Sequence, residues 1–240
     1  MLLLCLMLLS GPAQGDVIQE ALAHEGRTDA DRTRDRTSKP ADVVAFAGVK
    51  PGMTVLDFFA GGGYYSEILS HTVGPKGKIW LYNNNAYIGF VKDELAERLK
   101  DGRLKNIKQH TREADNMDLP DNHFDVVFMI LAYHDFFYDD TNWSVDEDKV
   151  FRDVLKALKP GGVLLMVDHA AVEGSEDKAA QRLHRIDEVF TKKDVSARGF
   201  TFLKQADFLR NSKDDRKISV FAPQIRRRTD RFVYLFQKPK

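Results

Sequence analysis

The sequence predicts an α/β protein with a Rossmann-like, doubly wound fold: a mostly parallel seven-stranded sheet with an antiparallel last pair. Short apolar runs alternate with longer amphipathic segments, which is typical of strands and helices that follow one another. The run DVVFMIL at 125–131 is continuously apolar, as expected for a strand that helices cover on both faces. The last two runs lack an intervening helix, so we expect them to pair antiparallel.

Each element has its own local signal. The predicted strands are residues 53–58, 78–82, 104–109, 125–131, 163–167, 200–206 and 232–237. The predicted helices are residues 64–72, 88–100, 146–158 and 177–198, the last with a break near Thr191. Glycine or proline follows each predicted helix, at Gly74-Pro75, Gly102, Pro160-Gly161 and Gly199. These residues end helices, so they set the expected boundaries.

The first fifteen residues, MLLLCLMLLSGPAQG, resemble a secretory signal peptide. Their apolar run is too short to span a bilayer, so we expect no stable membrane insertion. Small residues flank Gln14, as at a cleavage site, and we expect export to the bacterial periplasm or beyond; without a functional signal the protein is cytoplasmic. Cys5 is the only cysteine, so a chain cut after Gly15 has no disulfide, cysteine nucleophile or thiolate metal site.

Residues 16–40 form a polar N-terminal arm rich in arginine and aspartate, before a domain at 41–240. A solvated segment is the favoured interpretation. The alternative is an arm laid over a ligand site, where Arg27, Arg32 or Arg36 meets an anion. Arg185 presents a similar choice between binding a substrate carboxylate and lying on a solvated helix face, and we favour the solvated face.

The stretch VLDFFAGGGYYSE at 55–67 predicts a strand, a glycine turn and a helix start. Glycines allow close approach of a ligand and positive φ, and the helix start offers free N–H groups. A dinucleotide fingerprint would begin G-x-G-x-x-G directly after the strand. The spacing here is D-x-x-x-G-x-G instead, with Asp57, Gly61 and Gly63. A tight turn without a ligand is the alternative.

This stretch resembles motif I of the class I S-adenosylmethionine (SAM) dependent methyltransferases. Two later stretches resemble the family in order and spacing: the acidic-Ala-Asp and Leu-Pro run at 113–125 and the LKPGGVL turn at 158–164. With its leader, the chain is most similar to exported bacterial methyltransferase-like proteins. Such a protein would transfer the methyl group of SAM to a small molecule; the alternative is a non-catalytic SAM- or nucleoside-binding protein of the same fold.

The resemblance implies a set of cofactor-binding residues: Asp57, Phe59, Ala60, Gly61, Gly63, Asn83, Ala114 and Asp115. Asp115 would accept a hydrogen bond from the adenine amino group, with Ala114 beside the ring. Asn83 stands where the family usually has an acid for the ribose hydroxyls. Its amide oxygen can accept a hydrogen bond but lacks the charge that strengthens one.

Polar residues follow the predicted fourth and fifth strands, where methyl transfer should occur. His134 or His169 can act as general base, oriented by Asp135 or Asp168. The alternative is that these residues cap strand ends. A metal site built from the two Asp/His pairs is a weaker option, so we predict no metal.

Nucleic acid is not the expected acceptor. Lys and Arg total 36, as do Asp and Glu, so the basic excess typical of nucleic-acid binders is missing. The LAYH stretch at 131–134 lacks the signature of DNA methyltransferases, and Cys5 cannot be a cytosine-attacking nucleophile. The basic run at 226–228 is expected to be a solvated loop.

Overall fold

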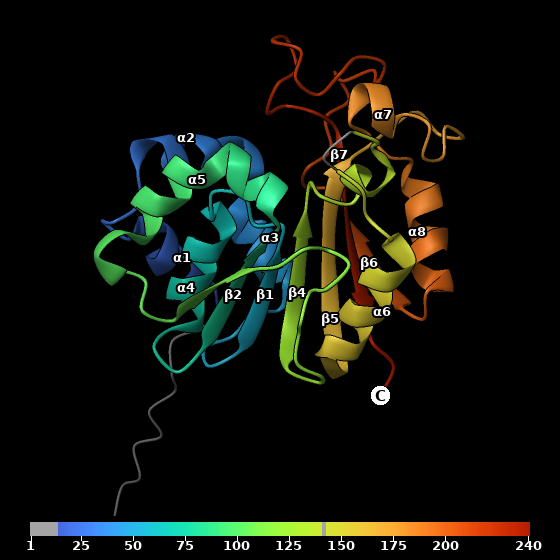
Figure 1. Cartoon of the computed structure of the whole chain (residues 1–240). Helices are drawn as coiled ribbons and strands as arrows, with labels where there is room; N and C mark the ends of the chain where they lie inside the picture. The colour runs from blue at the N-terminus through green and yellow to red at the C-terminus, as the bar shows by residue number, and fades with distance from the viewer. Residues whose placement is uncertain (1–13, 141–142) are drawn as a thin grey trace, which may run out of the picture.

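The computed structural model describes residues 14–140 and 143–240. It contains a seven-stranded sheet of order β3-β2-β1-β4-β5-β7-β6 (Figure 1). In that order the strands are Ile107–Thr111, Lys78–Asn83, Thr54–Phe58, Phe124–Ile130, Leu158–His169, Arg231–Gln237 and Thr201–Ala206. Neighbours from β3 to β5 are parallel, and β7 pairs antiparallel with β5 and β6. The predicted fold class is confirmed.

Helices cover both faces of this sheet, which explains its continuously apolar central strands. The helices are α1 (Gln14–Ala23), α2 (Asp29–Ser38), α3 (Pro40–Ala47), α4 (Tyr64–Val73), α5 (Asn85–Leu99), α6 (Glu147–Ala157), α7 (Ala180–Leu183) and α8 (Glu188–Ala197). Short 3-10 turns η1 and η2 span Lys100–Gly102 and His134–Phe137. Along β4, Val126 packs with α1, α3 and α4, whereas Val127 packs with α6 and α8 on the opposite side (Figure 1).

Several predicted boundaries are wrong. The third strand begins at Ile107, three residues later than expected, α5 begins at Asn85, three residues earlier, and β5 begins at Leu158, five residues earlier. The predicted helix over 177–198 is two helices, and the break is not near Thr191 but at 184–187. Asp187 causes this break because its carboxylate accepts hydrogen bonds from the backbone N–H groups of Val189 and Phe190 and so begins α8.

The N-terminal arm is helical and buries one face against the domain, so the expectation of a simply solvated segment is only partly correct. Ile18 of α1 is buried against α4, and Asp31 of α2 is buried despite its charge. Arg98 of α5 donates from Nη1 to Asp31 Oδ2 at 2.8 Å, and it also pairs with Glu67 of α4. Its Nε donates to the carbonyl oxygen of Gly62 at 2.5 Å. A buried ion cluster therefore joins the arm to the glycine turn.

The predicted leader lies largely outside the part of the chain that the structure describes, because that part begins at Gln14. Over residues 14–140 and 143–240, no helix has both the length and the apolar character that crossing a bilayer requires. The basic run at 226–228 is exposed, as predicted.

Replacing Arg98 tests the buried ion cluster. We expect Arg98→Met to lower the free energy of unfolding by about 3–5 kcal/mol, because it leaves Asp31 buried without its ion-pair partner and leaves Glu67 with Arg103 as its one remaining arginine partner among the described residues. Urea unfolding followed by circular dichroism measures the loss. Arg182→Met, at an exposed position, is the control and should change stability by less than about 0.5 kcal/mol. Equal effects of the two changes would contradict a structural role for the cluster.

Candidate active site

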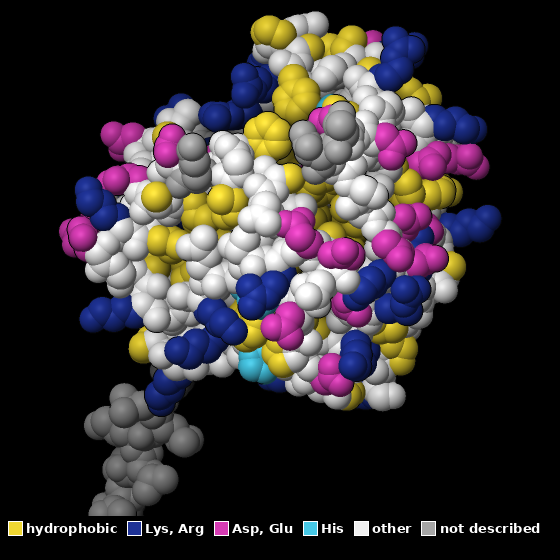
Figure 2. Space-filling model, viewed as in Figure 1, with side chains coloured by type: hydrophobic (Ala, Val, Ile, Leu, Met, Phe, Trp, Pro, Cys, Tyr) yellow, Lys and Arg dark blue, Asp and Glu magenta, His cyan; other side chains and the backbone are white. Residues whose placement is uncertain are grey.

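A cavity of about 900 Å³ opens at the carboxyl ends of β1, β4 and β5. In a doubly wound sheet, this edge is where ligands bind. The lining is largely apolar and aromatic, and Figure 2 shows hydrophobic side chains gathered between the α5 and α7 regions. The residues that line the cavity are Gly61, Asn85, Ala86, Tyr87, Gly89, Phe90, Val91, Leu131, His134, Asp135, Tyr138, Asp140, Trp143, His169, His184, Val220 and Phe221.

The glycine turn reaches this cavity through Gly61. Gly61 and Gly63 have backbone φ values of 57° and 78°, which residues other than glycine rarely adopt. Asn83 fixes the turn: its Oδ1 accepts from the Gly61 N–H at 2.9 Å, and its Nδ2 donates to the Gly61 carbonyl at 3.0 Å. Both polar atoms of the predicted ribose-binding side chain are thus engaged by the turn.

Asp57 ties the end of β1 to α4. Its carboxylate is buried and accepts a hydrogen bond from Ser66 Oγ at 2.6 Å. Burial raises the pKa of Asp57 to about 6, although the Ser66 hydrogen bond and the charge of Arg34 lower it. No hydrogen bond joins this carboxylate to the amides of the glycine turn in the described structure.

Phe59 forms an aromatic wall with Tyr87 and Trp143. The Phe59 and Tyr87 rings are stacked, with centroids 4.6 Å apart, and the Trp143 ring lies 5.4 Å from Phe59. Phe59 has a φ of 49°, and Leu131, just after β4, has 56°. Such values cost about 1–3 kcal/mol in a residue with a side chain and concentrate at functional sites. The strain lies where two strands reach the cavity.

The other predicted cofactor residues lie beside the cavity or outside its lining. Ala60 donates its N–H to the Tyr82 carbonyl at 3.0 Å, Ala114 is buried, and Asp115 is exposed. Of the eight predicted residues, Gly61 alone is among the described residues that line the cavity. The cofactor roles of the set stay predictions.

Asp168 organises the two candidate bases. Its Oδ1 lies 2.7 Å from His134 Nδ1, and its Oδ2 accepts from the His134 backbone N–H at 3.0 Å. It also accepts from the backbone N–H of His169 at 2.7 Å. His134 Nε2 lies 3.1 Å from Asp135 Oδ1. Both predicted aspartates therefore hold His134.

The two histidines have opposite pKa shifts. Burial lowers the pKa of His134, but the charges of Asp168 and Asp135 and the hydrogen bonds to them outweigh burial and raise it to about 10. Burial, together with the charge of His134, holds the pKa of His169 well below its usual value. His169 Nδ1 bonds to Thr229 Oγ1 at 2.7 Å, and its Nε2 has no hydrogen-bond partner among the described residues. Neutral His169 is therefore better suited than His134 to accept a proton.

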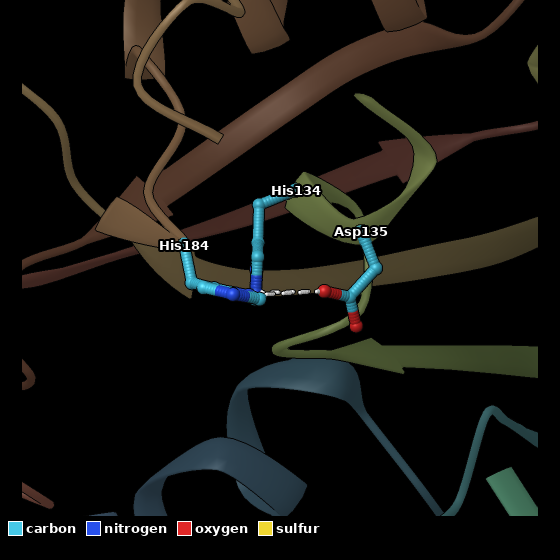
Figure 3. A group of neighbouring side chains, drawn as sticks. All are labelled: His134, Asp135 and His184. Atoms are coloured by element: carbon cyan, nitrogen blue, oxygen red, sulfur yellow. Dashed lines mark ion pairs between the residues drawn. The ribbon is translucent and has the colours of Figure 1, made fainter. Parts of the chain in front are cut away.

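His184 completes this end of the cavity, although the sequence analysis did not assign it a role. Its Nδ1 lies 3.5 Å from Asp135 Oδ1, and Figure 3 shows the His134, Asp135 and His184 side chains converging. Sequence spacing gives no signal for this contact, because about fifty residues separate His184 from Asp135. The neighbouring Arg185 is fully buried and pairs with Asp214 at 2.9 Å and 3.0 Å, so its predicted solvated position is wrong.

The raised pKa of Asp57 predicts a pH effect on stability. The folded state holds the Asp57 proton more tightly than the unfolded state, so the contribution of this group falls as pH rises from about 4 to about 6 and is constant above. Neutral Asp57→Asn avoids this loss and should gain about 2–3 kcal/mol relative to the parent between pH 4 and pH 7. Urea unfolding across that range measures the difference. Asp93→Asn, on the exposed side of α5, is the control, and its difference in unfolding free energy from the parent should not change with pH. If the difference for Asp57→Asn is also independent of pH, the raised pKa of Asp57 is ruled out.

The contacts of Asn83 predict the effect of restoring an acid. Asn83→Asp removes the donor to the Gly61 carbonyl and sets a negative charge beside that oxygen. We expect SAM affinity to fall by roughly tenfold rather than to rise, because the change removes one hydrogen bond that holds the turn. Isothermal calorimetry with SAM measures the change, and Asn116→Asp, at an exposed position, is the control. Tighter binding by Asn83→Asp would show that residue 83 meets the ribose.

Known proteins resemble this chain in sequence and in fold. The family model described as a methyltransferase domain matches residues 49–218. The ubiquinone/menaquinone biosynthesis C-methyltransferase UbiE of Shewanella sediminis is 32% identical over 123 residues, which are 51% of this chain and 45% of the relative. UbiE of Shewanella oneidensis is 30% identical over 126 residues, 52% and 46% of the two chains. The chain thus spans about half the length of the curated relatives it matches.

Two solved structures show the same fold at low sequence identity. A SAM-dependent methyltransferase from Aquifex aeolicus aligns with a TM-score of 0.63 and 20% identity over 94% of this chain and 99% of its own. The [4+2]-cyclase SpnF aligns with a TM-score of 0.57 and 17% identity over 95% and 97% of the two chains. The family match covers most of the chain, which therefore belongs to the methyltransferase domain family, in agreement with the expected methyl transfer from SAM.

Proposed function

We propose that the enzyme methylates a small, mostly apolar molecule that lies in the 900 Å³ cavity with its reacting group beside His169. The observation that carries this proposal is the distribution of side chains in the lining. Apolar and aromatic residues make up most of it, and His134, Asp135 and His169 lie just after β4 and at the end of β5. A few polar groups in an apolar cavity are typical of small-molecule sites.

The comparisons support an aromatic acceptor. The curated relatives are named for methylation at carbon in ubiquinone and menaquinone biosynthesis. A quinol-like ring would suit Tyr87 and Trp143, which line the cavity and pack on the buried Phe59 ring. A nucleic-acid acceptor is disfavoured, because basic and acidic residues are equal in number and are interspersed on the face shown in Figure 2.

The residues of the glycine turn fit the cofactor. Gly61 borders the cavity, its positive φ is fixed by Asn83, and the N-terminus of α4 follows directly. These groups would hold the methionine end of SAM, and Ala114 and Asp115 would meet its adenine. When bound, SAM supplies a methyl carbon activated by the adjacent sulfonium charge.

The protein groups then have separate tasks. His169 would accept the proton that the acceptor loses, through its Nε2, while Thr229 holds its other nitrogen. His134, held by Asp168 through Nδ1 and by Asp135 through Nε2, would fix the polar end of the cavity against which the acceptor lies. The aromatic wall excludes water from the reacting atoms and keeps the acceptor aligned.

Product formation tests this proposal. The purified chain is incubated with SAM and either hydroquinones and catechols or DNA and RNA, and S-adenosylhomocysteine is measured by mass spectrometry. We expect product with the phenolic acceptors only. His169→Gln should lower kcat by about 100-fold with an unchanged Kd for SAM, because it removes the base alone. His123→Gln, outside the cavity, is the control and should turn over normally.

Two outcomes would contradict the proposal. Product with nucleic acid alone would overturn the acceptor class. Normal turnover by His169→Gln would show that another group accepts the proton.

A further inference from the structure

Three side chains at the polar end of the cavity have the spacing of metal ligands. One potential ligand atom from each of His134, Asp135 and His184 lies within 4.8 Å of the others. Asp135 Oδ1 lies 3.1 Å from His134 Nε2 and 3.5 Å from His184 Nδ1 (Figure 3). With metal–ligand bonds of about 2.1 Å, neighbouring ligands in octahedral or tetrahedral geometry lie about 3.0–3.4 Å apart. A single ion can therefore bridge the three side chains after a small movement of His184.

The surrounding hydrogen bonds orient the ligand atoms toward a common point. His134 Nδ1 bonds to Asp168 at 2.7 Å, so Nε2 is the nitrogen left to bind an ion. A carboxylate on the far nitrogen is the usual support of a metal-binding histidine. Asp135 is held similarly: Tyr87 Oη donates to its Oδ2 at 2.7 Å, and Trp143 Nε1 donates to its carbonyl at 2.6 Å. Oδ1 of Asp135 faces the two imidazoles.

The third ligand is also held in place. His184 follows α7 with a φ of 51°, a costly conformation for histidine. Its ring lies between Tyr138 and Phe221, each with a centroid 4.8 Å away. The next residue, Arg185, is buried in its pair with Asp214 and anchors the segment. These contacts therefore hold His184 in its strained backbone conformation, with its side chain at the cavity.

We propose that His134, Asp135 and His184 bind a divalent transition-metal ion such as Zn²⁺. Two imidazoles and one carboxylate suit zinc and its neighbours better than Ca²⁺ or Mg²⁺, which favour oxygen ligands. Three protein ligands leave a position open, and all three residues line the cavity. The carboxylates of Asp135 and Asp168 supply the negative charge that a divalent cation balances.

This site deepens the proposed function and rests on it for its role. A phenolic or enolic oxygen of the acceptor would occupy the open position of the metal. The ion would favour the deprotonated acceptor by binding that oxygen as a Lewis acid. The proton would pass to His169, and no other bond would change until the methyl group is transferred.

Cobalt titration tests the site without cofactor or acceptor. The chain is freed of metal with a chelator, and Co²⁺ binding is followed by visible absorption and calorimetry. We expect one Co²⁺ per chain, displaced by Zn²⁺. His184→Asn and Asp135→Asn should each weaken Co²⁺ binding at least about tenfold. Asparagine at 184 tolerates the positive φ, and thermal unfolding without metal verifies that each variant is folded.

The matched control removes a different histidine. His24 is stacked on His71, with ring centroids 3.8 Å apart, and neither lines the cavity. His24→Ala should bind Co²⁺ as the parent does. Failure of the parent to bind Co²⁺, or unchanged binding in folded His184→Asn, would overturn the proposal. Because the titration contains neither SAM nor acceptor, such a failure would overturn the metal site only. Methyl transfer is tested separately by the product assay.

Discussion

The buried carboxylate of Asp168 holds the candidate active site together. It lies near the end of β5 and accepts hydrogen bonds from the His134 and His169 backbones as well as contacting the His134 ring. An unpaired carboxylate at this depth would be costly, so these contacts are obligatory for the fold. The turn after β4 is thereby locked to β5. Asp168 therefore sets the orientation of the His134 ring. Against the effect of burial, its charge raises the pKa of His134, and burial together with the charge of His134 lowers the pKa of His169.

A second set of contacts supports the cofactor side. Asn83 holds Gly61, and Arg98 holds the carbonyl of Gly62. Arg98 also pairs with Asp31 of α2, so the N-terminal arm reaches the turn through one side chain. The glycines permit the turn, but these partners select its single conformation. Changes in the arm should therefore affect cofactor affinity as well as stability.

The aromatic wall connects the two sides. Phe59 follows β1 and packs on Tyr87, whose hydroxyl donates to Asp135. A shift at the glycine turn would consequently move a residue that holds the proposed metal ligands. Both Phe59 and Leu131 keep a strained φ, which the packing around them must stabilise. Phe59 thus has a structural role before the glycines: it packs on Tyr87, and Tyr87 holds Asp135.

The sequence by itself determined the fold class, the glycine turn and the residues at the ends of β4 and β5. Those features depend on local patterns: a continuously apolar strand at 125–131, the spacing from Asp57 to Gly63, and polar residues directly after strands. Tertiary structure alone decided which partners each residue meets. Asn83 clamps a turn 22 residues away, and His184 joins Asp135 across about fifty, because strand order and the capping of α8 set those distances. Periodicity reports which face of an element is buried, but not which distant side chain lies against it.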